Sequence, residues 1–194
     1  MSLPHAILTA LLEKPSSGIE LTRRFDRSIG YFWSATHQQI YRELGKLEQS
    51  GAIRELRRQQ PAQGQKKEYE VLPAGRAELA AWVGRIEDPK PIRDALLLRL
   101  RAAGVVGTQD LYAEVGRHLV LHRAQLAEYR AIEARDFGPD RASPGDRVRH
   151  LVLRGGIDLE RFWVGWLEDA HRELREMAEE ARPDTGTGPE PTAK

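Results

Sequence analysis

The chain has 194 residues, of which 40% are hydrophobic and 30% charged, and its formal net charge is +1. That length is sufficient to bury a core and allows one or two domains; we expect two. Cysteine is absent, which excludes disulfides, thiolate catalysis and Cys-ligated zinc. We find no leader segment and no apolar run of the roughly 18 to 20 residues that a membrane span needs, so we expect a soluble cytoplasmic protein.

Two helices are expected at the start of the chain. Residues 3–14 carry apolar residues at helical spacing, and the run ends at Pro15. Residues 18–27 follow as a helix of about two turns. Its candidate core residues are Ile19, Leu21 and Phe25, with arginines on the outside.

The stretch around residues 36–51 predicts a third helix. Thr36 and Gln39 have the T-x-x-Q spacing of a capping box, and Gly51 supplies a stop. Ile40, Leu44 and Leu47 fall on one face and should pack inward. The opposite face carries amides and cations with almost no acid, namely Gln38, Gln39, Arg42, Lys46 and Gln49. Such a face suits base edges and phosphates.

After Gly51 the apolar period changes from helical to alternating. Residues 52–58 and 66–72 alternate apolar with charged residues on either side of a polar run, which predicts a β-hairpin with a basic tip. Pro73 then begins a fourth helix, and the DPKP sequence at 88–91 is a candidate hinge. Three helices, a hairpin and a connecting helix predict a winged helix-turn-helix domain over residues 1–88.

The second half is helical in pattern, so the expected fold class is mainly α, with an all-α domain over 89–181. We expect a helix from 92 that closes at Gly104, one capped by Thr108 and Asp110 that runs to Asp136, and one from Ser143 to about 181. The last helix is too long for a small monomer to cover, and its apolar stripe predicts packing along a second copy. The stripe comprises Val148, Val152, Gly155, Leu159, Phe162, Trp166, Ala170 and Met177. The tail, residues 182–194, is rich in Pro, Gly and Thr and should be disordered.

Basic residues recur on the elements of a winged helix that reach DNA. They are Arg23 and Arg24 on the second helix, Arg42 and Lys46 on the third, and Arg58, Lys66 and Lys67 beside the hairpin tip. Each alone is compatible with an ordinary solvated surface, but their joint placement favours DNA binding. Gln38, Gln39 and Arg42 are the best candidates for base contacts, because Gln can pair bidentately with adenine and Arg with guanine.

The segments HQQIYRELGKLEQSGAI and KKEYEVLPAGRAELAAWV, followed by a helical half containing LVLRGGIDLERFWVGWLEDAHRELRE, resemble the PadR family of transcriptional regulators. The resemblance extends to about residue 180. It implies a homodimeric repressor that binds an inverted-repeat operator and that, in some members, is released by a small aromatic ligand. By position it implies a recognition helix over 36–42, which adds Thr36, His37 and Tyr41 to the DNA-binding set, and a wing over 59–67. Many relatives carry Pro where this chain has Arg42, so the base preference does not transfer.

Two further clusters lie in the helical half. Phe162, Trp163 and Trp166 either form dimer or domain core, which we favour, or sandwich a flat ligand near the seam. Glu114, His118 and His122 share a helix face, but nothing supplies a further metal ligand, so we expect no metal site. No cofactor is expected either.

The sequence contains no G-x-S-x-G, no phosphate-binding loop and no dinucleotide-binding glycine motif. We therefore expect no enzyme, and the first hypothesis is a DNA-binding regulator with double-stranded DNA, a second copy and an effector as partners. A winged helix used as a protein-interaction adaptor is the alternative, and a ligand- or metal-binding enzyme on a helical bundle is the third.

Overall fold

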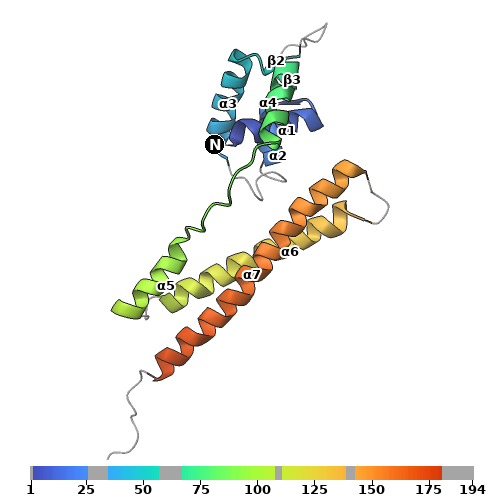
Figure 1. The fold of residues 1–194 in the computed structure, drawn as a ribbon. Helices are drawn as coiled ribbons and strands as arrows, with labels where there is room; N and C mark the ends of the chain where they lie inside the picture. Colours follow the sequence, from blue (N-terminus) through green and yellow to red (C-terminus); the bar gives the residue numbers. More distant parts are fainter. Residues whose placement is uncertain (1, 26–34, 57–66, 108–110, 139–142, 181–194) are drawn as a thin grey trace, which may run out of the picture. The chain divides into compact units, whose positions relative to one another are not determined.

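The fold is described by a computed structural model over residues 2–25, 35–56, 67–107, 111–138 and 143–180. Contacts divide the chain into two units, Met1–Lys90 and Pro91–Lys194 (Figure 1). No helix in these described ranges is long and apolar enough to cross a membrane. The domain limits at 88 and 181 stay predictions, as does the disorder of 182–194, which lies outside the described residues.

The N-terminal unit combines helices with a small sheet. The helices are α1 (Leu3–Glu13), α2 (Gly18–Arg24), α3 (His37–Gln49) and α4 (Pro73–Val83), and the strands are β1 (Ser16–Ser17), β2 (Ile53–Glu55) and β3 (Glu68–Val71). The fold class expected from the sequence, a winged helix followed by a helical half, is confirmed. Pro73 begins α4, as expected for a residue that has no N–H to donate.

The sheet has one strand more than the sequence indicated. β3 pairs antiparallel with β2, Ile53 opposite Val71, and on its other side with β1, Ser16 opposite Tyr69. The hairpin pairing was expected from alternation. β1 was not, because two serines after a proline carry no alternating pattern and pair only because the chain passes beside β3.

The core of the N-terminal unit gathers α1, α2, α3 and β2 around Leu8, Phe25, Ile40 and Ile53, which are at most 1% exposed. Ile19 does not belong to it, contrary to expectation, and is 38% exposed. Leu21 and Phe25 lie four apart on the inner face of α2, whereas Ile19 is two residues from Leu21 and points about 200° away.

Gly75 allows α4 to approach the sheet closely. A Cβ at this position would lie 2.3 Å from the carbonyl oxygen of Ala52 and 3.0 Å from Val71. About two turns further along the same face of α4, the ring of Trp82 stacks on His5 of α1, with centroids 4.5 Å apart. These two contacts fix α4 between the hairpin and α1.

The C-terminal unit comprises α5 (Ala95–Val106), α6 (Leu111–Asp136) and α7 (Pro144–Glu180). α6 and α7 lie side by side (Figure 1) and run antiparallel, since His122 meets Glu160 while Glu133 meets His150. Leu119 and Leu167 are among the buried residues between them. Ser143 directly precedes α7, and its hydroxyl accepts a hydrogen bond from the N–H of Asp146 at 3.1 Å, so the predicted start of this helix is confirmed to within one residue.

The predicted end of the first helix in this unit is wrong. α5 continues through Gly104 and ends at Val106, before Gly107 with φ +109°. Gly104 can stay helical because glycine adopts helical dihedral angles, at a cost of about 1 kcal/mol relative to alanine. Thr108 and Asp110, the predicted cap of α6, lie outside the described residues, whereas the predicted end of that helix at Asp136 is confirmed.

Candidate nucleic-acid interface

Helix α3 separates its two faces as the sequence predicted. Ile40, Leu44 and Leu47 are buried in the core of the N-terminal unit. The side chains of Gln38, Gln39, Arg42, Lys46 and Gln49 are all exposed. The helix therefore presents a polar, basic face while its apolar face holds it in place.

The N-terminus of α3 carries the predicted capping box. The Thr36 hydroxyl accepts a hydrogen bond from the Gln39 N–H at 3.2 Å, and Gln39 Oε1 accepts one from the Thr36 N–H at 2.8 Å. These bonds satisfy N–H groups that a helix start otherwise leaves unpaired. They also engage the oxygen of a side chain that the sequence suggested for base contact.

Tyr41 lies between α3 and α2. A Cβ on Gly18 would lie 2.5 Å from Cε1 of its ring, so the ring packs against α2 only because residue 18 is glycine. The Tyr41 side chain is still 49% exposed. Gly18 was missed by the sequence analysis; a glycine directly after the serine that caps α2 was the only local signal.

The cations on this unit differ in what they already bind. Arg42 and Arg23 are exposed and make no ion pair within the part of the chain that the structure describes. Lys46 Nζ lies 3.1 Å from Glu43 Oε2, and Lys67 Nζ lies 2.9 Å from Glu55 Oε2, a hydrogen bond that raises the pKa of Lys67. Such exposed pairs are weak and can exchange for phosphate.

Arg24 has a different environment from Arg23. Its Nη1 donates to the carbonyl oxygens of Ala10 and Lys14, at 2.6 and 3.3 Å, and its Nη2 pairs with Glu13 at 2.6 Å. The guanidinium thus binds the last carbonyls of α1, where a cation is favourable. A role in DNA binding, as the sequence suggested, would compete with these contacts.

Only some of the other residues predicted to contact DNA lie among the described residues. His37 is exposed at the first residue of α3. Arg58, Lys66 and most of the predicted wing, residues 59–67, lie outside the described residues; Lys67 alone of that range is described.

The aromatic cluster of α7 is divided between two faces. The ring of Trp163 stacks on His122 of α6 at 5.5 Å, and His122 Nδ1 lies 2.6 Å from Glu160 Oε2. Trp166 meets the edge of Trp163, while Phe162 is 56% exposed. One face of Trp163 is therefore covered, and a flat ligand would have to rest on Phe162 and Trp166 or displace His122.

Glu114, His118 and His122 lie on one face of α6. Among the described residues no group of His, Asp or Glu is arranged to hold a metal. Hydrogen bonds from Arg117 and Arg99 lower the pKa of Glu114 to about 2. The Glu114, His118 and His122 face is thus engaged in ion pairing and ring stacking.

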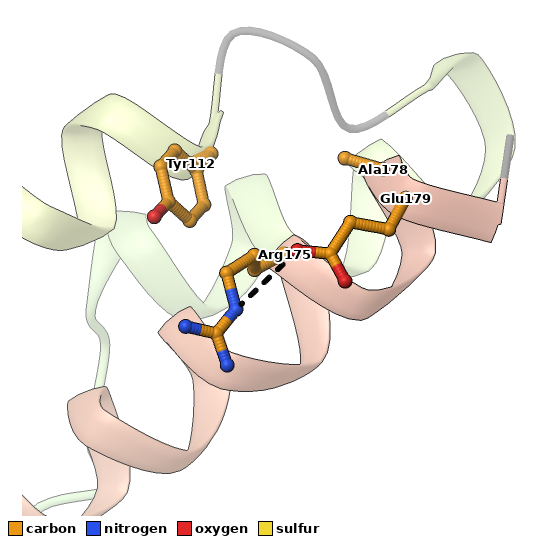
Figure 2. A pocket seen from close by; sticks show the side chains of 4 residues that line it. All are labelled: Tyr112, Arg175, Ala178 and Glu179. Atoms are coloured by element: carbon orange, nitrogen blue, oxygen red, sulfur yellow. Dashed lines mark ion pairs between the residues drawn. The ribbon is translucent and has the colours of Figure 1, made fainter. Parts of the chain in front are cut away.

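A shallow hollow of about 240 Å³ lies between α6 and α7. Figure 2 shows Tyr112 facing Arg175, Ala178 and Glu179 across it. The Arg175 Nε lies 3.8 Å from Glu179 Oε1. The hollow is smaller than ordinary ligand pockets, and its cation is already paired.

Comparison with protein families gives two matches that follow one another along the chain. Residues 7–81 match the model of the transcriptional regulator PadR-like family, and residues 92–175 match that of the virulence activator alpha C-terminal domain. The first covers α3 and the hairpin, and the second covers α5 and most of α7.

Individual relatives match over nearly the whole chain. A probable transcriptional regulator of Mycobacterium tuberculosis, Rv1176c, is 42% identical over 187 residues, covering 91% of this chain and 99% of its own. The negative transcriptional regulator PadR of Bacillus subtilis is 31% identical over 86% of this chain and 93% of its own.

Solved structures give the same result. PadR of B. subtilis in complex with operator DNA has a TM-score of 0.75 at 29% identity, and in complex with p-coumaric acid 0.72, each covering 90% of this chain and 99% of the other. The virulence activator AphA of Vibrio cholerae has a TM-score of 0.75 at 30% identity, covering 91% of this chain and 99% of its own.

Proposed function

This chain belongs to the PadR-like family of transcriptional regulators, and on that premise we propose that it is a homodimeric repressor that binds an inverted-repeat operator in the cytoplasm. The observation that supports DNA reading is the exposed polar face of α3, with Arg42 unpaired among the described residues and the helix held by a buried apolar face. In a helix-turn-helix the exposed side of the second helix enters the major groove.

A second copy is the partner that the exposed stripe of α7 fits best. Val148, Leu159 and Phe162 are each more than half exposed on the face turned away from the α6 contact. Acidic residues outnumber basic ones over 162–180, whereas basic residues outnumber acidic ones over 144–161. Two α7 helices packed antiparallel would therefore place opposite charges together along an apolar seam.

In such a dimer, the distance between the two recognition helices would determine the affinity for DNA. Two recognition helices must reach successive major-groove faces about 34 to 36 Å apart. A ligand that favours a different arrangement of the copies would lower affinity for DNA without touching it. The complex of PadR with p-coumaric acid supports an aromatic effector. The exposed ring of Phe162 and the partly buried ring of Trp166 support contact with it near the seam.

The test is binding of the full chain to the duplex upstream of its own gene, by fluorescence anisotropy against a scrambled duplex at several salt concentrations. We expect tight binding that prefers the native duplex at one dimer per site and weakens steeply with salt, because phosphate contacts release counterions. Arg42→Ala should weaken discrimination between the duplexes. The matched control is Arg130→Ala, which removes one exposed arginine from α6.

Equal binding to both duplexes at all salt concentrations would contradict the proposal and favour the adaptor hypothesis. Equal binding could also arise because the operator lies elsewhere. Selection of duplexes by the protein from a random-sequence library distinguishes that case from a protein without sequence preference. If no sequence is enriched by that selection, the proposal fails.

A further inference from the structure

The polar residues that begin α3 are not equivalent. We infer that Gln39 is a positioning residue that holds the start of the recognition helix, and that base reading falls to Gln38 and Arg42. The inference rests on the proposed DNA-binding function and assigns roles within that surface. It departs from the sequence pattern, which places Gln38 and Gln39 together as base readers.

The first argument is hydrogen bonding. A glutamine reads adenine bidentately through its amide oxygen and nitrogen together. Gln39 Oε1 already accepts from the Thr36 N–H at 2.8 Å and lies 3.2 Å from the Thr36 hydroxyl. Reading a base would release that oxygen and leave the Thr36 N–H without its partner at the helix start.

The side chains of Gln38 and Arg42 have no such hydrogen-bond partner among the described residues. Both are exposed, and neither side chain makes a hydrogen bond or an ion pair within the described ranges. They lie four residues apart, so they project from the same side of α3 on successive turns. That spacing lets an amide and a guanidinium contact neighbouring base pairs together.

The second argument comes from α2, which also begins with a capping box but has the charged Glu20 where α3 has the neutral Gln39. The Ser17 hydroxyl accepts from the Glu20 N–H, and the Glu20 carboxylate accepts from the Ser17 N–H at 2.9 Å. A carboxylate is the better residue there for helix stability, because it also interacts with the helix dipole. α3 makes the same pair of bonds with the neutral amide of Gln39, and a first turn without an acid does not repel phosphate.

The decisive variant is therefore Gln39→Glu, which keeps the capping geometry and adds one negative charge. Gln39→Ala removes the side-chain bond, and Gln38→Ala is the matched amide next to it. Each full-length variant is measured for its thermal midpoint and for affinity to the duplex selected by the wild-type protein, to that duplex with single base pairs changed, and to a scrambled duplex.

We expect Gln39→Glu to keep or raise the thermal midpoint while weakening every duplex by the same factor, roughly tenfold at low salt and less at high salt, because the added charge is screened. Gln39→Ala should lower the midpoint and weaken all duplexes without changing their order. Gln38→Ala should instead reduce discrimination at one base pair by about fivefold to a hundredfold. Thr36→Val should behave as Gln39→Ala does, and Thr36→Ser should restore wild-type behaviour.

Loss of discrimination at one base pair in Gln39→Ala would overturn the inference, because it would make Gln39 a reader. Wild-type affinity in Gln39→Glu would overturn it equally, because the charge would then lie away from the DNA. Failure of the proposed function has a different signature, since the wild-type protein itself would then show no salt-sensitive preference among duplexes.

Discussion

The two units of the chain differ in how completely they bury their apolar side chains. In the N-terminal unit, Ile7, Leu8 and Ile40 are completely buried. In the C-terminal unit, α7 buries Leu167 completely against its neighbours yet leaves Leu151 65% exposed on another face. The first unit gathers these side chains into its own core, whereas the second leaves apolar side chains of α7 exposed.

The exposed faces of the two units also suit different partners. α3 shows amides and cations, which suit the polar and charged surface of DNA. α7 shows valine, leucine and phenylalanine, and exposed apolar side chains suit an apolar protein surface. The predictions below test this difference, from the largest expected effect to the smallest.

Leu159→Asp should have the largest effect, because Leu159 is 53% exposed in the middle of the α7 stripe. A dimer about a two-fold axis loses the contact in both copies, so the loss should reach roughly 4 kcal/mol of association free energy. Light scattering should then show a monomer whose far-ultraviolet circular dichroism is unchanged.

The control for this change is Val105→Asp on α5, at a residue that is 88% exposed outside the stripe. It should leave the assembly as it is. A dimer that survives Leu159→Asp would show that α7 does not form the seam.

Gly75→Ala should destabilise the N-terminal unit by about 2 kcal/mol or more, because the new Cβ would overlap the backbone carbonyl of Ala52, directly before β2. Gly45→Ala on α3 is the matched glycine, since nothing lies within 4 Å of a Cβ there. It should instead stabilise by up to about 1 kcal/mol through helix propensity. Urea unfolding of both variants measures the difference, and equal values would contradict the close approach of α4.

Arg24→Met should lower stability by about 1.5 kcal/mol, because it removes charge-assisted hydrogen bonds to the end of α1 while keeping the aliphatic stem. Arg23→Met, one residue earlier, should change stability by less than about 0.5 kcal/mol. If DNA binding uses Arg23, that variant should lower duplex affinity at unchanged thermal midpoint. A thermal midpoint in Arg24→Met equal to wild type would show that the contact with α1 is dispensable.

His5 should add a small pH dependence confined to the N-terminal unit. Burial lowers the pKa of His5 below 6.5. Among the described residues neither ring nitrogen has a hydrogen-bond partner, and the Glu78 carboxylate lies 3.7 Å from Nε2. Because the unfolded chain binds the proton more readily, stability is full above about pH 6.5 and falls as the pH drops through the folded pKa.

The measurement is the thermal midpoint of the wild type and of His5→Phe between pH 7.5 and pH 5.5. His5→Phe keeps an aromatic ring against Trp82 and removes the proton site, so it should lose less stability on acidification. Parallel curves for the two proteins would contradict this role for His5.

Most of the fold could be predicted because its signals are local. The capping sites Thr36 and Ser143, the positive φ of Gly51 and the start of α4 at Pro73 depend on residues within one helical turn. One error occurred where a distant segment decides, since β1 exists because β3 passes beside it. The other was local: α5 continues past Gly104 because the low helix propensity of one glycine does not set a boundary alone.

The candidate site was predicted less completely than the fold. Residue type identified a polar face on α3, and the burial of Ile40, Leu44 and Leu47 confirms which side faces out. Residue type did not show that Gln39 Oε1 is engaged by Thr36, or that Arg24 binds the end of α1. Both depend on the conformation of side chains after folding.

The sequence by itself determined the periodicity, the helix starts and the division of α3 and α7 into faces, because these follow from spacing along one chain. Only the tertiary structure decided which members of each face remain available. Hydrogen bonds such as that between Arg24 and Ala10, and stacks such as that of Trp163 on His122, join residues far apart in sequence. A side chain's partners depend on three-dimensional proximity, which the pattern of residues along one element does not contain.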